Sequence, residues 1–442
     1  MMSLWQDVKT EERESLKGNI KADCVVVGGG MAGLMIAFEL QKRGFSVVVL
    51  EADRICSGAT GRTTAKITAQ HGDCYHKFIK NFGLSSAKMY FESNTRGIDK
   101  YARLIRELDI DCEYKKTPSY IYGRYSEKEI QKETAAADKV GAMYKFTDKT
   151  SLPFEVKGAL KFENQAQFHP VKFAKALSQN LRIYEKTPAI HIEDGKVVTA
   201  QGTVDTHYIV VATHYPIINF PGLYFLRQHQ ERSCCVALKT DRTIDGMYLG
   251  IDDGKSLRSF HGGVIVGGEN YRTGENSKGG CLCRLKDYAS ECYAEAEFVS
   301  EWTNQDVLTH DGLPFIGRYS FFTPRIFVAT GFGKWGMSFS AVASDLIADL
   351  ICDRKNDYEK LYTPNRVKIK AAFPSFLVDA GYSVKGLAQG FFSKKEKRCT
   401  HLGCRLRENR EEGTLECPCH GSQFDKKGKV GFSPAKRNIG QK

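Results

Sequence analysis

Six cysteine and histidine residues near the C-terminus have the types and spacing that metal or redox chemistry requires. They lie in two short segments, Cys399-Thr400-His401-Leu402-Gly403-Cys404 and Cys417-Pro418-Cys419-His420-Gly421-Ser422. The chain has 14 cysteines, and the other ten are scattered. The polar N-terminus carries both charge signs and shows no export signal. Clustered cysteines in such a chain favour a metal or redox site over a framework of structural disulfides.

Each segment supplies one thiol and one imidazole, Cys399 with His401 and Cys417 with His420. Two thiolates can hold one iron and two imidazoles the other, which is the ligand set of a Rieske two-iron, two-sulfur cluster. Zinc also accepts two cysteines and two histidines, but zinc fingers present a cysteine pair followed by a histidine pair. The alternating order therefore favours the Rieske cluster, with zinc as the competing interpretation.

The two segments resemble the cluster-binding loops of Rieske proteins. The resemblance implies a disulfide between Cys404 and Cys419 that joins the loops, and a hydrogen-bond donor at Ser422. Phe424 stands where relatives in cytochrome bc complexes have a tyrosine, so one donor is missing and a lower reduction potential is expected. Only 20 residues follow Ser422. We therefore expect a minimal Rieske fold that leans on the rest of the protein.

A glycine-rich segment near the N-terminus has the form of a dinucleotide site. Gly28-x-Gly30-x-x-Gly33 follows an apolar run at 24–27 and opens a helical pattern. The glycines permit a tight turn, a close approach to a pyrophosphate and close packing of helix on strand. Phosphates then lie at the positive end of the helix dipole. A second apolar run, 46–50, ends at Glu51, a carboxylate placed to bind ribose hydroxyls.

Segments far from this fingerprint indicate which dinucleotide binds. They are the hydroxyl-rich run 57–64, Val211-Ala212-Thr213, Gly267-Gly268-Glu269, Asp311-Gly312-Leu313-Pro314-Phe315-Ile316-Gly317 and the glycine-rich run 330–337. At these residues the chain resembles the glycine oxidase/D-amino-acid oxidase family of FAD-dependent oxidoreductases, over about residues 20–365. Gly331-x-Gly333-x-x-Gly336 is interpreted as the family's late flavin contact, because no strand ending in an acidic residue follows it. A separate NAD(P) site is therefore not expected.

The fingerprint and the resemblance together predict the residues that contact FAD. They are Gly28, Gly30, Met31, Ala32, Gly33, Glu51, Ala52, Gly61, Thr63, Thr64, Ala212, Thr213, Gly331, Phe332, Lys334, Trp335, Gly336 and Met337.

Catalytic residues are harder to predict. Relatives in this family hold a substrate carboxylate with arginine and often place a cation near the flavin, which makes Lys334 and Arg258 the candidates, with Arg272 behind them. His71-x4-His76 matches part of the iron site of Rieske oxygenases, but no carboxylate lies at the expected spacing. His71 and His214 are therefore interpreted as structural or flavin-near residues.

The elements expected to position these residues alternate between strand and helix. Short strands are predicted at 209–212, 264–266 and 326–329, a long amphipathic helix at 84–109 and a last helix at about 338–353. Around 365–390 the helical signal ends, and a domain boundary is placed near 370–380. The fold class is an α/β FAD-binding domain (Rossmann-like, glutathione-reductase type) with an interleaved α+β substrate domain, plus a small all-β Rieske domain.

The domain limits predicted from these patterns are 1–372 for the FAD-dependent oxidoreductase and 373–442 for the short Rieske domain. The FAD-binding parts are expected at about 20–83, 150–215 and 300–365, with the substrate parts between them.

Composition limits the class of protein. Of 442 residues, 42% are hydrophobic and 26% are charged, as in globular proteins, and no apolar run is long enough to span a membrane. The net charge is +12, and residues 391–442 contribute +7 of it. Without stacking aromatics or a nucleic-acid motif, this basic surface favours an acidic electron-transfer partner over nucleic acid. The protein is expected in the cytoplasm.

The sequence thus predicts a flavoenzyme acting on CH–NH or CH–NH2 donors. A hydride from a C–N bond of an amine or amino acid goes to FAD, and electrons then pass singly through the Rieske cluster to an acceptor. Two alternatives remain open. One is an amino-acid oxidase that reduces oxygen and has a structural cluster, and the other is a non-catalytic redox sensor.

Overall fold

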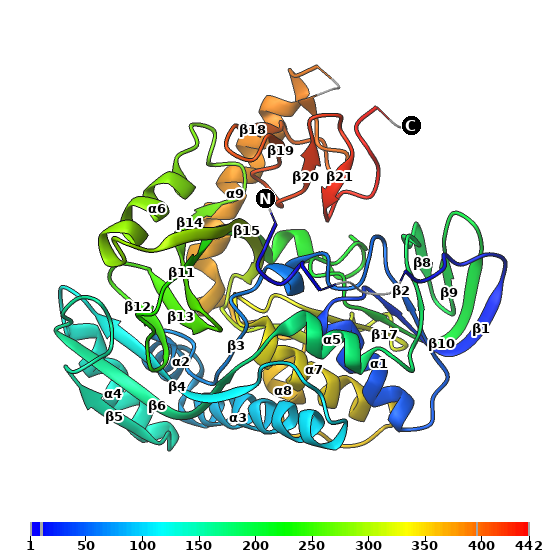
Figure 1. The fold of residues 1–442 in the computed structure, drawn as a ribbon. Helices are drawn as coiled ribbons and strands as arrows, with labels where there is room; N and C mark the ends of the chain where they lie inside the picture. The colour runs from blue at the N-terminus through cyan, green and yellow to red at the C-terminus, as the bar shows by residue number, and fades with distance from the viewer. Residues whose placement is uncertain (1, 9–11, 395–396, 441–442) are drawn as a thin grey trace.

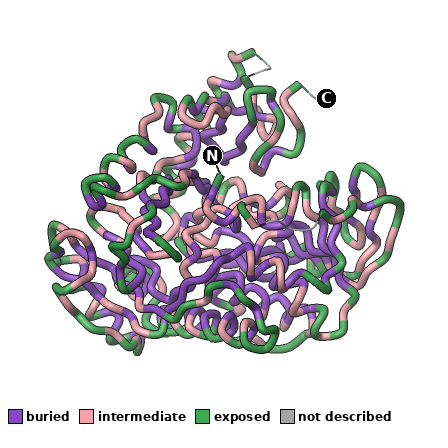
Figure 2. The backbone as a smooth tube through the Cα atoms, viewed as in Figure 1, coloured by how far each residue is buried: buried purple, intermediate pink, exposed green. Residues whose placement is uncertain are grey.

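The computed structural model of the chain describes residues 2–8, 12–394 and 397–440. Three β-sheets organise these residues (Figure 1). Two large sheets and their helices form the main body, and the third, a small sheet, lies beside the N-terminal segment at one end of the molecule. Buried residues line the strands of both large sheets (Figure 2).

The first sheet is built around strand β1 (Ile20–Val27), which pairs in parallel with two neighbours. Its burial is complete on both faces from Cys24 to Val27, which explains the continuous apolar run. Helices α1 (Met31–Lys42) and α7 (Gly336–Ile351) pack on each other and against this sheet. The strand order is β16 (Phe315–Arg318), β17 (Ile326–Thr330), β10 (Thr203–Val211), β1, β2 (Val47–Leu50) and β7 (Arg182–Tyr184), and β9 (Lys196–Val198) joins β10 and β8 (His191–Glu193).

The second sheet is mostly antiparallel and has nine strands. Its order is β15 (Glu297–Thr309), β11 (Gln228–Lys239), β14 (Gly263–Arg272), β13 (Ser256–Phe260), β12 (Met247–Gly250), β4 (Lys115–Gly123), β6 (Gly158–Gln167) and β3 (Lys66–Ile67), with β5 (Tyr144–Thr147) paired to β6. Five helices lie between these strands along the chain: α2 (Cys74–Phe82), α3 (Leu84–Glu107), α4 (Lys128–Val140), α5 (Pro170–Leu177) and α6 (Cys281–Cys292). Of these, α5 packs on α1 and α3 packs on α7, so they also contact the helices of the first sheet.

Strand membership refines the predicted FAD-binding parts. Within 150–215, β6 belongs to the second sheet, so the chain joins the first sheet only from β7 onward. Likewise β15, at the start of 300–365, belongs to the second sheet. The domain limits as a whole stay a prediction, whereas the two interleaved sheets confirm the predicted fold class.

Strand β11 has two different faces because side chains alternate along a strand. Cys235 and Ala237 lie in the core that contains α1 and α7, whereas Cys234 and Val236 lie in the core that contains α6. The same alternation continues toward the start of the strand, where Glu231 and Arg232 point to opposite sides. This alternation matters below, because the two faces meet two different sites.

The third sheet holds the C-terminal domain. Four short antiparallel strands form it, β18 (Arg407–Asn409), β19 (Thr414–Glu416), β20 (Gln423–Asp425) and β21 (Val430–Phe432). A separate small core of buried side chains fills it: Cys399, Cys404, Leu406, Cys417, Cys419, Phe424 and Ala435. The predicted small all-β domain is therefore confirmed.

The main difference from the sequence prediction is helix α9 (Ile369–Phe391). The helical signal was expected to end in this region, because Pro374 and several glycines interrupt it. Instead, a 23-residue helix contains Pro374 and runs into the C-terminal domain (Figure 1). The predicted helix at 84–109 and the last predicted helix are present as α3 and α7. Among the described residues, no helix is long and apolar enough to cross a membrane.

Candidate functional site

The fingerprint glycines lie where β1 ends and α1 begins. A Cβ atom added to Gly33 would lie 1.9 Å from the carbonyl oxygen of Gly28, and one added to Gly28 would lie 2.5 Å from the carbonyl oxygen of Ala212. Gly28 also has a φ of 112°, in the region that favours glycine. Only glycine allows this close packing of the loop, the strand end and the start of the helix, which is the arrangement of a dinucleotide-binding turn.

Glu51 lies directly after β2 and against the glycine loop. Its carboxylate accepts hydrogen bonds from the backbone N–H groups of Gly29 (2.6 Å) and Asp53 (2.8 Å). Burial raises the pKa of Glu51. The sequence did not single out Thr60, whose hydroxyl accepts the N–H of Met31 at 2.9 Å. The hydroxyl-rich run that contains Thr60 was the available signal.

The segment after Thr60 is held in place through its backbone. Arg258 is buried and donates to the carbonyl oxygens of Thr64 (2.9 Å) and Ala65 (2.8 Å), and the indole N–H of Trp302 donates to that of Arg62 (2.8 Å). Arg258 therefore positions the loop predicted to contact FAD at Gly61, Thr63 and Thr64. Its role as a catalytic cation remains a prediction, and these contacts give it a structural task.

The late glycine-rich segment joins β17 to α7 and is anchored to the end of β15. Gly333 donates its N–H to the carbonyl of Val307 at 2.9 Å. A Cβ atom on Gly331, whose φ is 73°, would lie 2.3 Å from a methyl group of Thr309. Lys334 has a φ of 75° and its ammonium lies 3.2 Å from the carboxylate of Glu231 on β11. The strained backbone at Lys334 turns this cation toward the second sheet.

A cluster of charges surrounds Lys334 that the sequence did not predict. Glu231 and Asp306 lie opposite each other on the paired strands β11 and β15. Burial alone would raise the pKa of Glu231, but a hydrogen bond from His229 and the charge of Lys334 lower it to about 2. For Asp306, burial raises the pKa to about 6. Two acids in one place thus have very different proton affinities, an arrangement typical of functional sites.

The two histidines considered for an oxygenase iron have separate partners. His71 contacts the Tyr90 hydroxyl and the carbonyl of Thr68 through its two nitrogens, and its ring stacks on Trp335 with centroids 4.4 Å apart. Burial lowers the pKa of His71 to about 3, so the imidazole is neutral. His76 instead pairs with Glu133 at 2.8 Å. His71 thus packs on Trp335 of the glycine-rich run 330–337, which is predicted to contact FAD and is called the flavin segment below, and forms no metal site with His76.

The cysteine and histidine residues of the C-terminal domain come together as a Rieske cluster requires. The Nδ1 atoms of His401 and His420 are buried and have no hydrogen-bond partner among the described residues. The Nε2 atom of His401 faces the Asn219 side-chain oxygen at 2.8 Å. The two rings lie 5.0 Å apart, and burial lowers the pKa of both imidazoles, to about 3 for His401 and about 4 for His420. Neutral rings with free Nδ1 atoms fit ligation of iron.

The predicted disulfide partners lie close together. The sulfur atoms of Cys404, Cys417 and Cys419 are all within 4.8 Å of one another, and all three thiols are unbonded in the structure. The disulfide between Cys404 and Cys419 therefore stays a prediction. Helix α9 approaches both loops through glycines. A Cβ atom on Gly386 would lie 2.4 Å from the Cys419 sulfur, and one on Gly390 would lie 2.1 Å from the carbonyl oxygen of Gly403.

The two positions expected to tune the cluster are both in its small core. The hydroxyl of Ser422 is in hydrogen-bonding contact with the Cys399 thiol and also accepts the N–H of Ala435 at 3.1 Å. Phe424 is fully buried and offers no donor.

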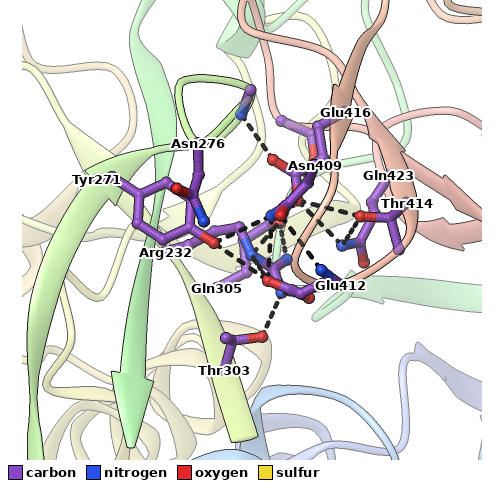
Figure 3. Close-up of polar contacts among 12 residues, drawn as sticks. Arg232, Tyr271, Asn276, Thr303, Gln305, Asn409, Glu412, Thr414, Glu416 and Gln423 are labelled. Atoms are coloured by element: carbon purple, nitrogen blue, oxygen red, sulfur yellow. Dashed lines mark hydrogen bonds and ion pairs between the residues drawn. The ribbon is translucent and has the colours of Figure 1, made fainter. Parts of the chain in front are cut away.

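The second face of β11 carries the contacts to the C-terminal domain. Gln230 donates to the carbonyl oxygens of His420 (2.7 Å) and Ser433 (2.9 Å). Arg232 has no exposed side-chain surface, and its guanidinium pairs with Glu412 and with Glu416 at 3.6 Å. Figure 3 shows Arg232 reaching from β11 toward Glu412, beside Tyr271 and Gln305. A buried cation on one domain is therefore neutralised by carboxylates of the other.

A second ion-pair network joins α9 to both sites. Asp379 on α9 accepts from Arg272 and His310 and lies 3.0 Å from the Nδ1 of His229. Arg272 in turn donates to the carbonyls of Pro418 (2.9 Å) and Cys419 (3.2 Å) in the second cluster loop.

Comparison with known proteins places these two sites in known families. The model of the FAD-dependent oxidoreductase (DAO) family matches residues 23–350, and that of the Rieske [2Fe-2S] domain matches residues 388–441. The chain is thus an FAD-dependent oxidoreductase of the DAO family. Its C-terminal domain is a Rieske domain, so FAD and a two-iron, two-sulfur cluster are its cofactors, as the sequence predicted.

Individual relatives cover either the whole chain or one part of it. The Rieske 2Fe-2S iron–sulfur protein YhfW of Bacillus subtilis is 33% identical over 97% of this chain and 94% of its own length. Gamma-glutamylputrescine oxidoreductase of Escherichia coli is 28% identical over 45% of this chain and 50% of its own length. Glycine oxidase from Geobacillus kaustophilus shares the fold of the oxidoreductase part, with a TM-score of 0.67 and 18% identity over 79% of this chain and 99% of its own.

Proposed function

We propose that this protein oxidises a C–N bond of an amine or amino acid and passes the electrons one at a time through the Rieske cluster to an acceptor. One observation carries the proposal. Neighbouring residues of a single strand, β11, face the two cofactor sites: Glu231 pairs with Lys334 of the flavin segment, whereas Gln230 bonds to the backbone of the cluster ligand His420. This arrangement supports the proposal, because the two predicted sites then contact opposite faces of one strand.

The cofactors supply the chemistry: bound FAD accepts a hydride, and the cluster carries single electrons. The residues of the chain do the rest. Lys334 and Glu231 hold a fixed ion pair beside the flavin segment. Burial raises the pKa of Asp306 to about 6. This carboxyl can therefore exchange a proton near neutral pH, as the release of a proton from a substrate amine requires.

The substrate class and the acceptor rest on different grounds. Amine or amino-acid substrates are favoured because similar proteins include a glycine oxidase and a gamma-glutamylputrescine oxidoreductase. An acidic carrier in the cytoplasm is favoured by the basic C-terminal residues, since charge complementarity speeds association. Nucleic acid is not proposed as a partner.

The test is an anaerobic screen of amines and amino acids with the full-length holoprotein. A substrate should bleach the flavin and then reduce the cluster within the same turnover. The variant His420→Ala should lose the Rieske signal, keep FAD and its reduction by substrate, and fail to reduce a one-electron acceptor protein. His191→Ala, which removes an exposed histidine on β8, serves as the matched control.

Two outcomes would favour the alternatives. If His420→Ala reduces the acceptor at the wild-type rate, or if oxygen consumption accounts for all substrate used, the protein is an oxidase with a structural cluster. If no substrate bleaches the flavin while chemical reductants do, a redox sensor is the better assignment.

A further inference from the structure

Helix α9 lies at the surface, and the side that it presents to solvent is largely apolar. Asp379, the one acidic residue of the helix, is buried and paired with Arg272, His229 and His310. On the outer side Phe391 and Phe392 are 75% and 87% exposed. Exposed apolar patches of this kind mark sites of interaction. The exposed apolar residues of α9 and its C-cap are Phe373, Phe376, Leu377, Val378, Val384, Leu387, Phe391 and Phe392.

Two further segments carry exposed apolar side chains. One is the loop that leads into η2 (Tyr224–Leu226), with Phe220 and Leu226, and η2 contacts α9. The other is the turn between β16 and β17, where Phe321 and Phe322 are 79% and 84% exposed.

Hydrogen bonds hold these segments together. Arg227 donates to the carbonyl of Pro364 at 2.6 Å, just before α9, and the Tyr224 hydroxyl donates to the carbonyl of Tyr319 at 2.8 Å. We call the exposed residues of the three segments, with Val367, the apolar face.

The charge of these segments is strongly one-sided. Residues 214–227, 319–325 and 366–398 contain ten lysines and arginines and two acidic residues. Arg325 and Arg366 pair with Asp194 and Asp311, and Asp379 pairs with Arg272. Apart from these three, the segments hold eight basic residues and one acidic residue. Exposed lysines lie at the start of the helix, once further along it and beyond its end: Lys368, Lys370, Lys385, Lys394 and Lys397. A surface with this combination fits a partner that is apolar inside and negatively charged outside.

We propose that the apolar face docks on the surface of an anionic lipid bilayer. Aromatic and aliphatic side chains enter the boundary between headgroups and acyl chains, while the lysines reach the phosphates, as in interfacial amphipathic helices. Anionic headgroups attract such basic segments. A lipid surface also adapts to three separate segments, whereas a rigid protein partner would need a matching shape.

Docking in this way would bring the cluster toward the membrane. The loop of the apolar face also carries Asn219, bonded to His401, and Phe225, whose ring lies 6.0 Å from that of His420. The histidine edge of the cluster therefore lies behind the docked loop. The inference does not depend on the substrate or on the direction of electron flow, so vesicle binding can fail without affecting the proposed function.

The experiment is co-sedimentation of the full-length holoprotein with vesicles. We expect binding to vesicles of equal phosphatidylglycerol and phosphatidylcholine, and at least tenfold weaker binding to pure phosphatidylcholine. The double variant Phe391→Ser/Phe392→Ser should weaken binding to the anionic vesicles at least tenfold. The matched control Tyr125→Ser/Met143→Ser changes two side chains that are 68% and 69% exposed elsewhere on the surface and should bind like the wild type.

Flavin and cluster spectra of each variant show that it is folded, and a second variant, Val384→Ser, repeats the test with a smaller change. Equal binding by the Phe391/Phe392 variant and the control would overturn the proposal, as would equal binding to charged and neutral vesicles. Absence of vesicle binding, with a dimer that the Phe391/Phe392 variant dissociates, would assign the face to a second copy of this chain and would also overturn it.

Discussion

The two cofactor sites of this protein are built in opposite ways. The predicted flavin contacts are spread from Gly28 to Met337. At several of them other atoms approach a glycine so closely that a Cβ atom would clash. The four predicted cluster ligands lie within 22 residues of one another, but their surroundings come from distant segments: Asn219, Phe225, Gln230, Arg272 and α9. The comparison teaches that a compact motif can depend on the rest of the chain as much as a dispersed one. The predictions below test that dependence.

The largest effect is expected at the ion pairs between the two domains. Arg232→Met leaves Glu412 and Glu416 buried without their cation, which typically costs about 3–5 kcal/mol. We expect the C-terminal domain to unfold at a lower urea concentration. The visible circular dichroism of the cluster measures this unfolding. Arg284→Met, which removes an exposed partner of Glu269, should cost less than about 1 kcal/mol. If both variants shift the urea midpoint of unfolding equally, the stability of the C-terminal domain does not depend on the contacts of Arg232.

Substitution of either of two glycines should affect one cofactor site and leave the other intact. Gly33→Ala places a methyl group against the Gly28 carbonyl, and we expect a loss of about 3 kcal/mol, or roughly 100-fold, in FAD affinity, with the cluster retained. Gly386→Ala places a methyl group against the Cys419 sulfur and should reduce cluster content while FAD remains. Both contents are measured on purified protein by flavin absorbance and iron analysis. Loss of both cofactors in either variant would contradict independent assembly.

A substitution of Glu51 should cause a smaller loss of FAD affinity than Gly33→Ala. Glu51→Ala removes the hydrogen bonds that the ribose hydroxyls donate to a charged acceptor, worth about 1.5–3 kcal/mol. FAD affinity of the wild type should also fall as pH is lowered, because the carboxylate must be ionised to accept both ribose hydroxyls. Burial raises the pKa of Glu51, so this loss should begin at higher pH than for an ordinary glutamate. Titration of apoprotein with FAD measures both effects, and unchanged affinity in Glu51→Ala would remove Glu51 from the site.

The smallest change concerns the cluster potential. Phe424→Tyr introduces a donor beside the cluster, and one hydrogen bond of about 1 kcal/mol raises a one-electron potential by roughly 40 mV. Phe432→Tyr, on the neighbouring strand, is the control and should leave the potential unchanged. Protein-film voltammetry compares the three proteins. A fall in potential for Phe424→Tyr would show that the missing donor does not explain the tuning of this cluster.

The sequence predicted those parts of the sites that depend on local patterns. The glycine fingerprint, Glu51 and the four cluster ligands follow from spacing and residue type. Glu231, Asp306 and Arg232 could not be predicted, because their roles depend on pairing between β11 and strands far along the chain. Helix α9 was missed for a different reason. Its glycines and proline weaken the helical pattern, yet Gly386 and Gly390 are the residues that let the helix lie against the cluster loops.

The alternation of side chains along β11 also limits how the length of the chain can vary. Inserting or deleting one residue between His229 and Cys235 would turn Glu231 away from Lys334 and Arg232 away from Glu412 in a single step. Substitutions in this strand disturb one site at a time, whereas a change in length disturbs both. Insertions should therefore be tolerated in the loop that follows β11 but not within the strand, which an insertion scan through residues 228–245 would show directly.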